Sequence, residues 1–413
     1  MNILITGATG LIGRALGSEL AKQGHRLFVV TRNRSTTIRD LAFPCHIIEA
    51  DLTIEPIHDE RLDEIDTDIH LAGENLADKK WTVAQKKIIY DSRVKGTQNL
   101  LNSFPEHSKL NLFISTSAIG YYGDRNSEVL TEVSSRGQGF VSDLCSDWEH
   151  PVLLAERKNR FTDCRYAILR TGLVLSTQGG FLYNLLTPFR LGGGFILGNG
   201  RHWLSWIHIQ DLVQIYIFIL SNKSLSGIIN AVSPEPVTFR DFAKKLASVY
   251  RNKVRLIIPE VFFKIFLGEL SQLLFSSQRV LPNKISQTPF QFYFDSLEKA
   301  FEDLFSNQKK RLYAVECEQF FPYLPEQIRN EVKQLKIDLN QLNSKFISFF
   351  ILNWVHESEL SAMSGGSFLY DKIEYTLREI SIFNILIDFY IKKKVYKLFQ
   401  IRRATLAQQI DRQ

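Results

Sequence analysis

The chain has 413 residues, 45% of them hydrophobic, and a formal net charge of +6. This length and composition allow two or three globular domains with large buried cores. The four cysteines are scattered and form no C-x-x-C pair, and no apolar run approaches the ~18 residues that span a bilayer. We therefore expect no metal site, no disulfide framework and no transmembrane segment, and a cytoplasmic protein without a signal peptide.

The first half of the chain alternates apolar strands with amphipathic helices. This alternation predicts an α/β fold of the Rossmann type, built on a doubly wound parallel sheet of six strands. The expected strands are 2–6, 26–32, 45–52, 66–73, 110–118 and 164–175, and the expected helices are 14–24, 82–104 and 140–158.

The segment GATGLIG follows the first strand and carries Gly7, Gly10 and Gly13 at every third position. Glycine there allows a tight turn, close approach of backbone amides to a pyrophosphate, and close packing of the next helix. The amino end of that helix offers unpaired N–H groups to the phosphates. The spacing is a variant of G-x-G-x-x-G, but its place between strand and helix favours a dinucleotide site over a merely structural turn.

The end of the second strand indicates which dinucleotide is bound. The segment VVTRNRS contains Arg32 and Arg34 and no carboxylate that could bond a ribose 2′-hydroxyl. Guanidinium groups favour a 2′-phosphate, so we expect NADP(H) as the cofactor. Two ordinary solvated arginines are the alternative interpretation.

From about residue 178 the chain becomes rich in glycine and aromatic residues, with helices expected at 239–251 and 259–275. We expect residues 1–225 to form the cofactor-binding domain and 226–305 a small substrate or cap region. A polar hinge at 306–311 precedes a separate module, 312–413.

The last module ends in a basic stretch, 391–403, whose apolar residues recur at helical spacing. This pattern predicts a helix with one buried and one solvated face, and a nucleic-acid or anionic-membrane surface is the less favoured alternative. Earlier in the module, SFLYDKIEYTL alternates with period two and predicts an antiparallel strand after a Gly-Gly hairpin.

Several motifs in order resemble one protein superfamily. TGATGLIG, EADLT, HLAG and FISTSAIGYYGD are similar to the extended short-chain dehydrogenases/reductases, which include nucleotide-sugar epimerases. More narrowly, the segments at 70–97, 192–213, 230–238 and 278–285 resemble the atypical epimerase-family proteins, which carry a small C-terminal cap. The resemblance covers about residues 1–305.

This resemblance implies a set of residues around an NADP(H) molecule. The pyrophosphate would be lined by Gly7, Gly10, Leu11, Ile12 and Gly13. Arg32 would face the adenosine ribose, Asp51 and Leu52 the adenine, and Leu71, Ala72 and Gly73 the nearer ribose. Ser115 and Ser117 would lie beside the nicotinamide.

The superfamily's chemistry uses a tyrosine and a lysine four residues later on one helix, together with a serine on the preceding strand. Ser117 holds the serine position, but Phe140 and Leu144 stand where the tyrosine and lysine belong. Neither can carry a proton. Tyr121 and Tyr122 are therefore the candidate substitutes, with Arg125 as a cation that could acidify a phenol; packing in a loop is the alternative.

Three further residues have two interpretations each. His202 and His208 could shape a substrate pocket or be structural histidines bonded to the backbone. Arg93, on the long helix beside the expected cleft, could meet an anionic substrate or pair with a carboxylate.

Residues 312–413 resemble the helix-grip fold of polyketide-cyclase and START-like ligand carriers, shortened between Arg329 and Lys345. The whole chain thus reads as an NADP(H)-binding, epimerase-like oxidoreductase. Its small-molecule substrate is not named by the sequence, and a nucleotide-linked compound is one candidate. The alternative is a non-catalytic NADP(H)-binding sensor or scaffold. A homodimer is left open.

Overall fold

The computed structural model describes residues 1–190, 194–250, 252–254, 256–306, 312–321, 351–363, 366–377, 395, 399 and 400. The chain divides into two compact units. The first comprises Met1–Leu20, His25–Thr37 and Cys45–Phe301, and the second comprises Ala21–Gly24, Ile38–Pro44 and Glu302–Gln413.

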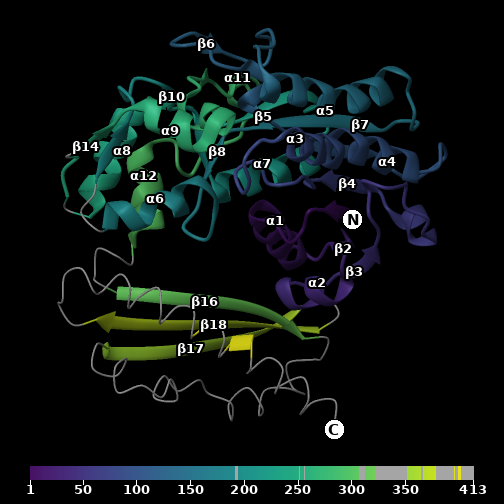
Figure 1. The fold of residues 1–413 in the computed structure, drawn as a ribbon. Helices are drawn as coiled ribbons and strands as arrows, with labels where there is room; N and C mark the ends of the chain where they lie inside the picture. The colour runs from purple at the N-terminus through teal and green to yellow at the C-terminus, as the bar shows by residue number, and fades with distance from the viewer. Residues whose placement is uncertain are drawn as a thin grey trace. The chain divides into compact units, whose positions relative to one another are not determined.

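A seven-stranded sheet forms the centre of the first unit, and all its strand pairs are parallel (Figure 1). Its order is β12-β7-β5-β4-β1-β2-β3, which reverses direction between β1 and β4. Ligands of open α/β sheets bind where the order reverses, outside the carboxyl ends of the strands. The strands are β1 (Asn2–Thr6), β2 (Arg26–Thr31), β3 (His46–Glu49), β4 (Thr67–His70), β5 (Leu112–Ala118), β7 (Arg165–Thr171) and β12 (Gly227–Ala231).

The Rossmann-type sheet is confirmed, with two differences from the sequence expectation. A seventh strand, β12, pairs with β7, although its residues were assigned to the cap region. The expected strand at 164–175 is two strands, because after Gly172 the chain leaves the sheet and β8 (Leu173–Leu175) pairs with β11 (Trp206–His208). A Cβ at residue 172 would lie 2.7 Å from the Ser205 carbonyl oxygen, so only glycine permits this close approach.

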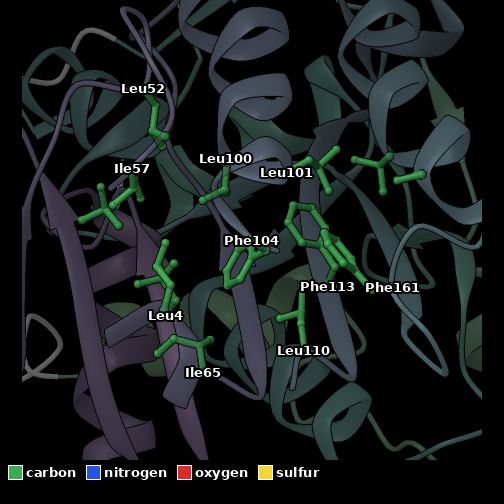
Figure 2. Close-up of a cluster of buried hydrophobic side chains, with 14 of the residues drawn as sticks. Leu4, Leu52, Ile57, Ile65, Leu100, Leu101, Phe104, Leu110, Phe113 and Phe161 are labelled. Atoms are coloured by element: carbon green, nitrogen blue, oxygen red, sulfur yellow. The ribbon is translucent and has the colours of Figure 1, made fainter. Parts of the chain in front are cut away.

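Helices cover both faces of the sheet. On one face, side chains of α4 (Gly96–Ser103) and α5 (Phe140–Arg157) pack with the strands in an apolar cluster that includes Leu4, Leu100 and Phe113 (Figure 2). On the other face, Thr116 of β5 lies 2.6 Å from the Tyr216 hydroxyl of α7 (Ile209–Ser221). Because successive side chains of a strand point to opposite faces, Ser115 and Ser117 lie on the α5 side.

The long helix expected at 82–104 is present but is not uniform. Thr82 caps it by accepting the N–H of Gln85 at 3.1 Å. It runs as α3 (Val83–Tyr90), then a π-helical turn, η2 (Asp91–Lys95), then α4. Wide turns of this kind inside α-helices are rare and are frequent at functional sites.

The remaining elements up to residue 304 lie wholly or mostly in this unit. The helical ones are α1 (Leu11–Lys22), α2 (Arg34–Asp40), η1 (Glu60–Glu64), η3 (Ile119–Tyr122), α6 (Gly180–Arg190), α8 (Phe239–Val249), α9 (Glu260–Leu267), η4 (Gly268–Ser271), α10 (Gln272–Phe275), α11 (Asn283–Ser286) and α12 (Leu297–Leu304). Three of them, α1, α2 and α12, extend by a few residues into the second unit. Strand pairs are formed by β6 (Val129–Leu130) with β15 (Arg279–Val280), β9 (Phe195–Leu197) with β14 (Leu256–Ile258), and β10 (Trp203–Leu204) with β13 (Val237–Thr238).

The second unit contains a three-stranded antiparallel sheet of order β16-β18-β17. Its strands are β16 (Leu312–Phe321), β17 (Ile351–Met363) and β18 (Gly366–Leu377). Met363 pairs with Gly366, which confirms the predicted hairpin at the Gly-Gly pair. The hinge residues 307–311, the segment 329–345 and most of the basic stretch 391–403 lie outside the described residues.

Among the described residues, no helix is both long and apolar enough to cross a membrane.

Candidate functional site

The glycine turn lies where the strand order of the sheet reverses. Gly7 follows β1 with a φ of +70°, and a Cβ there would lie 2.8 Å from the Ala72 nitrogen and the Leu71 carbonyl oxygen. A Cβ on Gly13 would lie 2.4 Å from the Gly7 carbonyl oxygen. Real Cβ atoms do not approach backbone so closely, so both positions require glycine. The turn is held by the Gly10 N–H, which donates to the Gly7 carbonyl at 3.0 Å, and α1 begins at the next residue.

The loop after β4 is tied to the end of β1 through one buried hydroxyl. The Thr6 Oγ1 accepts the backbone N–H groups of Leu71 and Ala72, each at 3.1 Å. It also lies 2.7 Å from Nδ1 of His70. These bonds fix the loop 71–73 beside the glycine turn, which is where the sequence places the ribose-lining residues.

The hydrogen-bond chain continues from this loop into the π-helical turn. Nε2 of His70 lies 2.9 Å from the Thr97 hydroxyl, which donates to the Arg93 carbonyl oxygen at 2.6 Å. Since the Thr97 proton is already used, His70 carries its proton on Nε2 and accepts the Thr6 proton at Nδ1. Burial, with a smaller contribution from the charge of Arg93, lowers the pKa of His70 to about 3, so its ring is neutral.

At the end of the site proposed for the adenosine, the arginine side chains are exposed to solvent. Arg32 and Arg34 are exposed, and the side chain of Asn33 between them accepts the N–H of Thr36 at 3.0 Å. Asp51 uses its carboxylate to hold the turn after β3, accepting the Thr53 N–H at 2.9 Å. The remaining implied residues, Leu11, Ile12, Leu52 and Ser115, are partly or fully buried.

Ser117 belongs to a buried network that the sequence analysis did not foresee. Its hydroxyl donates to Oε1 of Glu149 at 2.7 Å, and Glu149 forms a two-pronged ion pair with Arg170 at 2.8 and 2.7 Å. All three side chains are at least 96% buried. Burial alone would lower the pKa of Arg170, but the hydrogen bonds and charge of Glu149 outweigh it and raise that pKa.

The same arginine reaches Tyr122. Nη1 of Arg170 donates to the Tyr122 hydroxyl at 3.0 Å, and this hydroxyl donates to Oδ1 of Asn230 at 2.8 Å. Tyr122 and Asn230 are fully buried. Burial raises the pKa of the Tyr122 phenol despite the opposing effect of Arg170, so this phenol is a weaker acid than a free tyrosine.

Tyr121 is placed differently from its neighbour. Its side chain is half-buried, and the Arg170 guanidinium carbon lies 3.4 Å from its ring centroid. Arg125, the expected cation, is instead held by Glu128 at 2.6 Å. The cation beside the phenols is therefore Arg170 and not Arg125. A charged residue inside the apolar strand YAILRTG was the signal that could have identified it.

Phe140 and Leu144 belong to an apolar cluster. Neither side chain has a group that could carry a proton. This cluster includes Trp81, Trp148 and Leu270. The nearby Cys145 is buried, which raises the pKa of its thiol to about 12 and leaves it un-ionised. The two positions of α5 that would carry the Tyr–Lys pair are thus occupied by apolar side chains here.

The two histidines are packed against aromatic rings. His202 is stacked on Phe239 with ring centroids 5.1 Å apart, and Nδ1 of His208 caps α7 by accepting the Gln210 N–H at 3.2 Å. Burial lowers the pKa of each to about 4. These contacts favour the structural interpretation. Within the described part of the chain, no group of three or more histidine, cysteine, aspartate or glutamate side chains could hold a metal ion.

Comparison with known families fits this geometry. Residues 3–231, more than half of the chain, match the NAD dependent epimerase/dehydratase family. The chain belongs to this epimerase family. Residues 258–304 of this epimerase-family chain match DUF1731, a domain of unknown function.

Relatives within the epimerase family align over about three quarters of the chain. The chloroplastic epimerase family protein SDR39U1 homolog of Arabidopsis thaliana is 32% identical over 304 residues, covering 73% of this chain and 85% of the relative. The structure of the human epimerase family protein SDR39U1 with NADPH is 27% identical, with a TM-score of 0.65, and covers 74% of this chain and all of that one. A nucleoside-diphosphate sugar epimerase from Corynebacterium glutamicum is 33% identical, with a TM-score of 0.59, covering 75% of this chain and 61% of that one.

The matched families end at residue 304, so they give no support to the START-like relationship expected for 312–413. The C-terminal domain that is matched, DUF1731, lies instead within the expected cap region. The antiparallel strands of the second unit agree with the strand prediction for that module and do not by themselves define a helix-grip fold.

Proposed function

We propose that this epimerase-family protein binds NADP(H) at the glycine turn and is an epimerase-like oxidoreductase of the extended short-chain dehydrogenase/reductase superfamily. The observation that carries the proposal is the turn itself, where Cβ atoms on Gly7 and Gly13 would strike backbone. This close backbone packing brings the N–H groups of the turn and the amino end of α1 together at the end of β1, which suits a diphosphate. The fixed loop 71–73 beside it offers backbone to a ribose.

Preference for the phosphorylated coenzyme rests on Arg32, which is exposed at the end of β2 and free to meet a 2′-phosphate. The NADPH in the human SDR39U1 structure supports the same choice. We expect tighter binding of NADPH than of NADH, measured by coenzyme fluorescence on titration. Arg32→Ala should weaken NADPH binding by about tenfold to a hundredfold and leave NADH binding almost unchanged. Equal affinity of the native chain for the two coenzymes would remove the arginine argument.

NADP(H), when bound, would supply or accept a hydride. Among the proposed catalytic residues, Tyr121 is the only one whose side chain is not fully buried, so we assign it the proton transfer to the substrate. Ser117 and Tyr122 are held by Glu149 and Arg170, and they shape the wall beside Tyr121. The substrate proposed is a small carbonyl or sugar compound of the nucleotide-linked class.

The catalytic assignment is tested by single substitutions. Screening NADPH oxidation against carbonyl substrates should reveal a turnover that Tyr121→Phe reduces at least tenfold, with NADPH affinity unchanged. Ser117→Ala and Tyr122→Phe should also reduce it. Turnover that none of these substitutions affects would show that the chemistry lies elsewhere.

A non-catalytic NADP(H)-binding sensor or scaffold is the second candidate. It is favoured by Phe140 and Leu144, which stand where the usual proton-carrying tyrosine and lysine would be. It is also favoured by the Ser117 hydroxyl, which donates its hydrogen bond to Glu149 and so has no proton left to donate to a substrate. This candidate predicts tight NADPH binding with no NADPH oxidation by any carbonyl substrate. The two candidates differ only in that assay, since both need the glycine turn.

The division into a cofactor domain (1–225), a cap (226–305) and a separate module (312–413) remains a proposal, as do a cytoplasmic location, a homodimer and the START-like relationship. Brief trypsin digestion tests the division, because cleavage within the lysine-rich stretch 306–311 should release the first part with its NADPH binding intact. Loss of binding on that cleavage would contradict it.

A further inference from the structure

Arg93 is a buried charge without a counter-ion. Its side chain is 8% exposed, and within the described part of the chain no carboxylate lies within ion-pair distance. Among the described residues, its guanidinium group makes one hydrogen bond, a long contact of 3.4 Å from Nη1 to the Ile89 carbonyl oxygen. Burial lowers the pKa of Arg93 to about 10, and the group therefore still carries its charge at neutral pH. Burying such a charge is costly unless an anion meets it.

The surroundings of Arg93 are arranged around its guanidinium group. The guanidinium carbon lies 5.1 Å from the ring centroid of Trp148, and a Cβ on Gly73 would lie only 3.1 Å from it. The π-helical turn and the Thr97 bond to the Arg93 carbonyl hold its backbone against the loop 71–73. Glycine at 73 thus leaves the room that the guanidinium occupies.

Among the residues that the structure describes, those near Arg93 add a second hydrogen-bond donor without an acceptor and no unpaired negative charge. Nε1 of Trp148 is buried and has no hydrogen-bond partner in the part of the chain that the structure describes. The charge of Glu74 raises the pKa of Arg93, but the Glu74 carboxylate is paired with another cation, the ammonium group of Lys79, at 3.9 Å. The Cys145 thiol stays neutral because burial raises its pKa to about 12. A cation and an N–H donor without acceptors are what an anionic oxygen group would satisfy.

We propose that Arg93, stacked on Trp148 beside Gly73, is an anion-recognition site that binds a carboxylate or phosphate group of the substrate. The inference rests on the proposed function, because loop 71–73 is the segment assigned to the coenzyme ribose. It deepens that proposal by giving the substrate a negative charge next to the coenzyme. Arg93 is kept buried and unpaired in the free protein so that substrate binding completes the ion pair.

The test measures anion binding with the full chain, using inorganic phosphate and malonate against chloride at equal ionic strength. Both probes should raise the thermal midpoint of the native chain and quench indole fluorescence, without coenzyme and with saturating NADPH. Arg93→Met should weaken probe binding about tenfold, and Arg93→Lys should retain part of it. Trp148→Phe, which keeps an aromatic ring, should weaken it less.

Free-protein stability separates this role from a structural one. Without probes, Arg93→Met should be at least as stable as the native chain, because it removes an uncompensated charge. The matched control is Arg136→Met, whose arginine forms an exposed pair with Asp143 at 2.6 Å and whose loss should not alter probe binding.

Three results would overturn the inference. The first is an Arg93→Met chain that binds the probes like the native one, and the second is an Arg93→Met chain that is less stable with unchanged probe binding. The third is loss of probe binding in saturating NADPH together with weaker NADPH binding by Arg93→Met, which would assign Arg93 to a coenzyme phosphate. Failure of the native chain to bind NADPH, with probe binding intact, would instead remove the proposed function and keep the anion site.

Discussion

Gly13 shows how a single missing side chain can decide binding. A Cβ at this position would lie 2.4 Å from the Gly7 carbonyl oxygen and 2.6 Å from the Ala8 Cα, so the turn would have to open. Because these neighbours are backbone atoms, they cannot move aside as a flexible side chain would. We expect Gly13→Ala to reduce NADPH affinity at least about tenfold, measured by fluorescence titration.

The control for this substitution is Gly96→Ala, at the start of α4. A Cβ there would meet the Asp91 carbonyl oxygen at 3.8 Å, an ordinary contact, so NADPH binding should not change. Alanine in a helix should also stabilise the fold by about 0.5–1 kcal/mol. If Gly13→Ala bound NADPH as well as Gly96→Ala does, the pyrophosphate would not lie at this turn.

Asp68 is a residue whose burial lowers the stability of the molecule. It lies between Leu4 and Phe113 in the sheet register, and neither of its oxygens has a hydrogen-bond partner among the described residues. Burial raises its pKa well above the ordinary value, so the folded protein holds a proton that the unfolded chain releases. Asp68→Val should therefore increase the free energy of unfolding at pH 7 by about 1–3 kcal/mol, measured by urea unfolding.

The size of this stability gain depends on pH. A raised folded-state pKa means that the cost of Asp68 is absent near pH 4 and grows as pH rises above the unfolded value of about 3.9. The gain from Asp68→Val should accordingly be smaller at pH 5 than at pH 7. An equal stability gain at pH 5 and pH 7 would mean that the gain comes from better packing of valine and not from removal of an ionisable group.

At the scale of elements, the pair Arg170–Glu149 joins β7 to α5. Breaking a buried ion pair leaves one charge uncompensated, which costs about 3–5 kcal/mol. Glu149→Gln should cost this much because it strands Arg170, and it should also free the Ser117 hydroxyl. The exposed pair Arg125–Glu128 is the control, since Glu128→Gln should cost about 0–1 kcal/mol. Chemical unfolding that shows equal losses for the two variants would contradict the assigned role.

The elements that periodicity defines were predictable, and those that depend on distant contacts were not. Apolar runs gave β1, β2 and β5 nearly to the residue because a buried parallel strand must be apolar along its length. The short strand β12 was placed in the cap because nothing local in GIINA shows that it pairs with β7. The π-helical turn at Arg93 was equally hidden, since no local pattern in DSRVK distinguishes it from the α-helix on either side.

The residues of the candidate site likewise separate into those that could be predicted from local sequence and those that could not. The glycine turn and the exposed Arg32 were visible in the sequence because both depend on local backbone and strand ends. The pairing of Ser117 with Glu149 was not, because it joins residues 32 positions apart across a helix and a strand. Arg125 was favoured over Arg170 only because it is closer to Tyr121 in sequence.

For the whole molecule, three buried histidines dominate the response to acid. Burial lowers the pKa of His70 to about 3 and those of His202 and His208 to about 4, whereas an unfolded histidine titrates near 6.5. Between these pKa values and pH 6.5, the histidines of the unfolded chain therefore bind protons that those of the folded chain do not bind. The stability that these histidines contribute is fully present above pH 6.5 and is lost as pH falls from 6.5 towards 4.

As pH falls, Asp68 has the opposite effect, because its cost to the stability of the folded chain decreases. We expect the stability lost through the three histidines to exceed this gain, so that the chain unfolds cooperatively between pH 6.5 and 4. By the conversion of pKa shifts into free energy, His202 and His208 each contribute up to about 3 kcal/mol, and His70, whose pKa is lowered further, up to about 5 kcal/mol. His202→Phe is the informative variant, because the His202 ring already stacks on Phe239 and its Nε2 has no hydrogen-bond partner among the described residues. Circular dichroism at a series of pH values should show unfolding at lower pH and with a shallower pH dependence than in the native chain. Unchanged midpoint and slope would show that His202 is not neutral in the folded state, since only a neutral buried ring takes up a proton on unfolding.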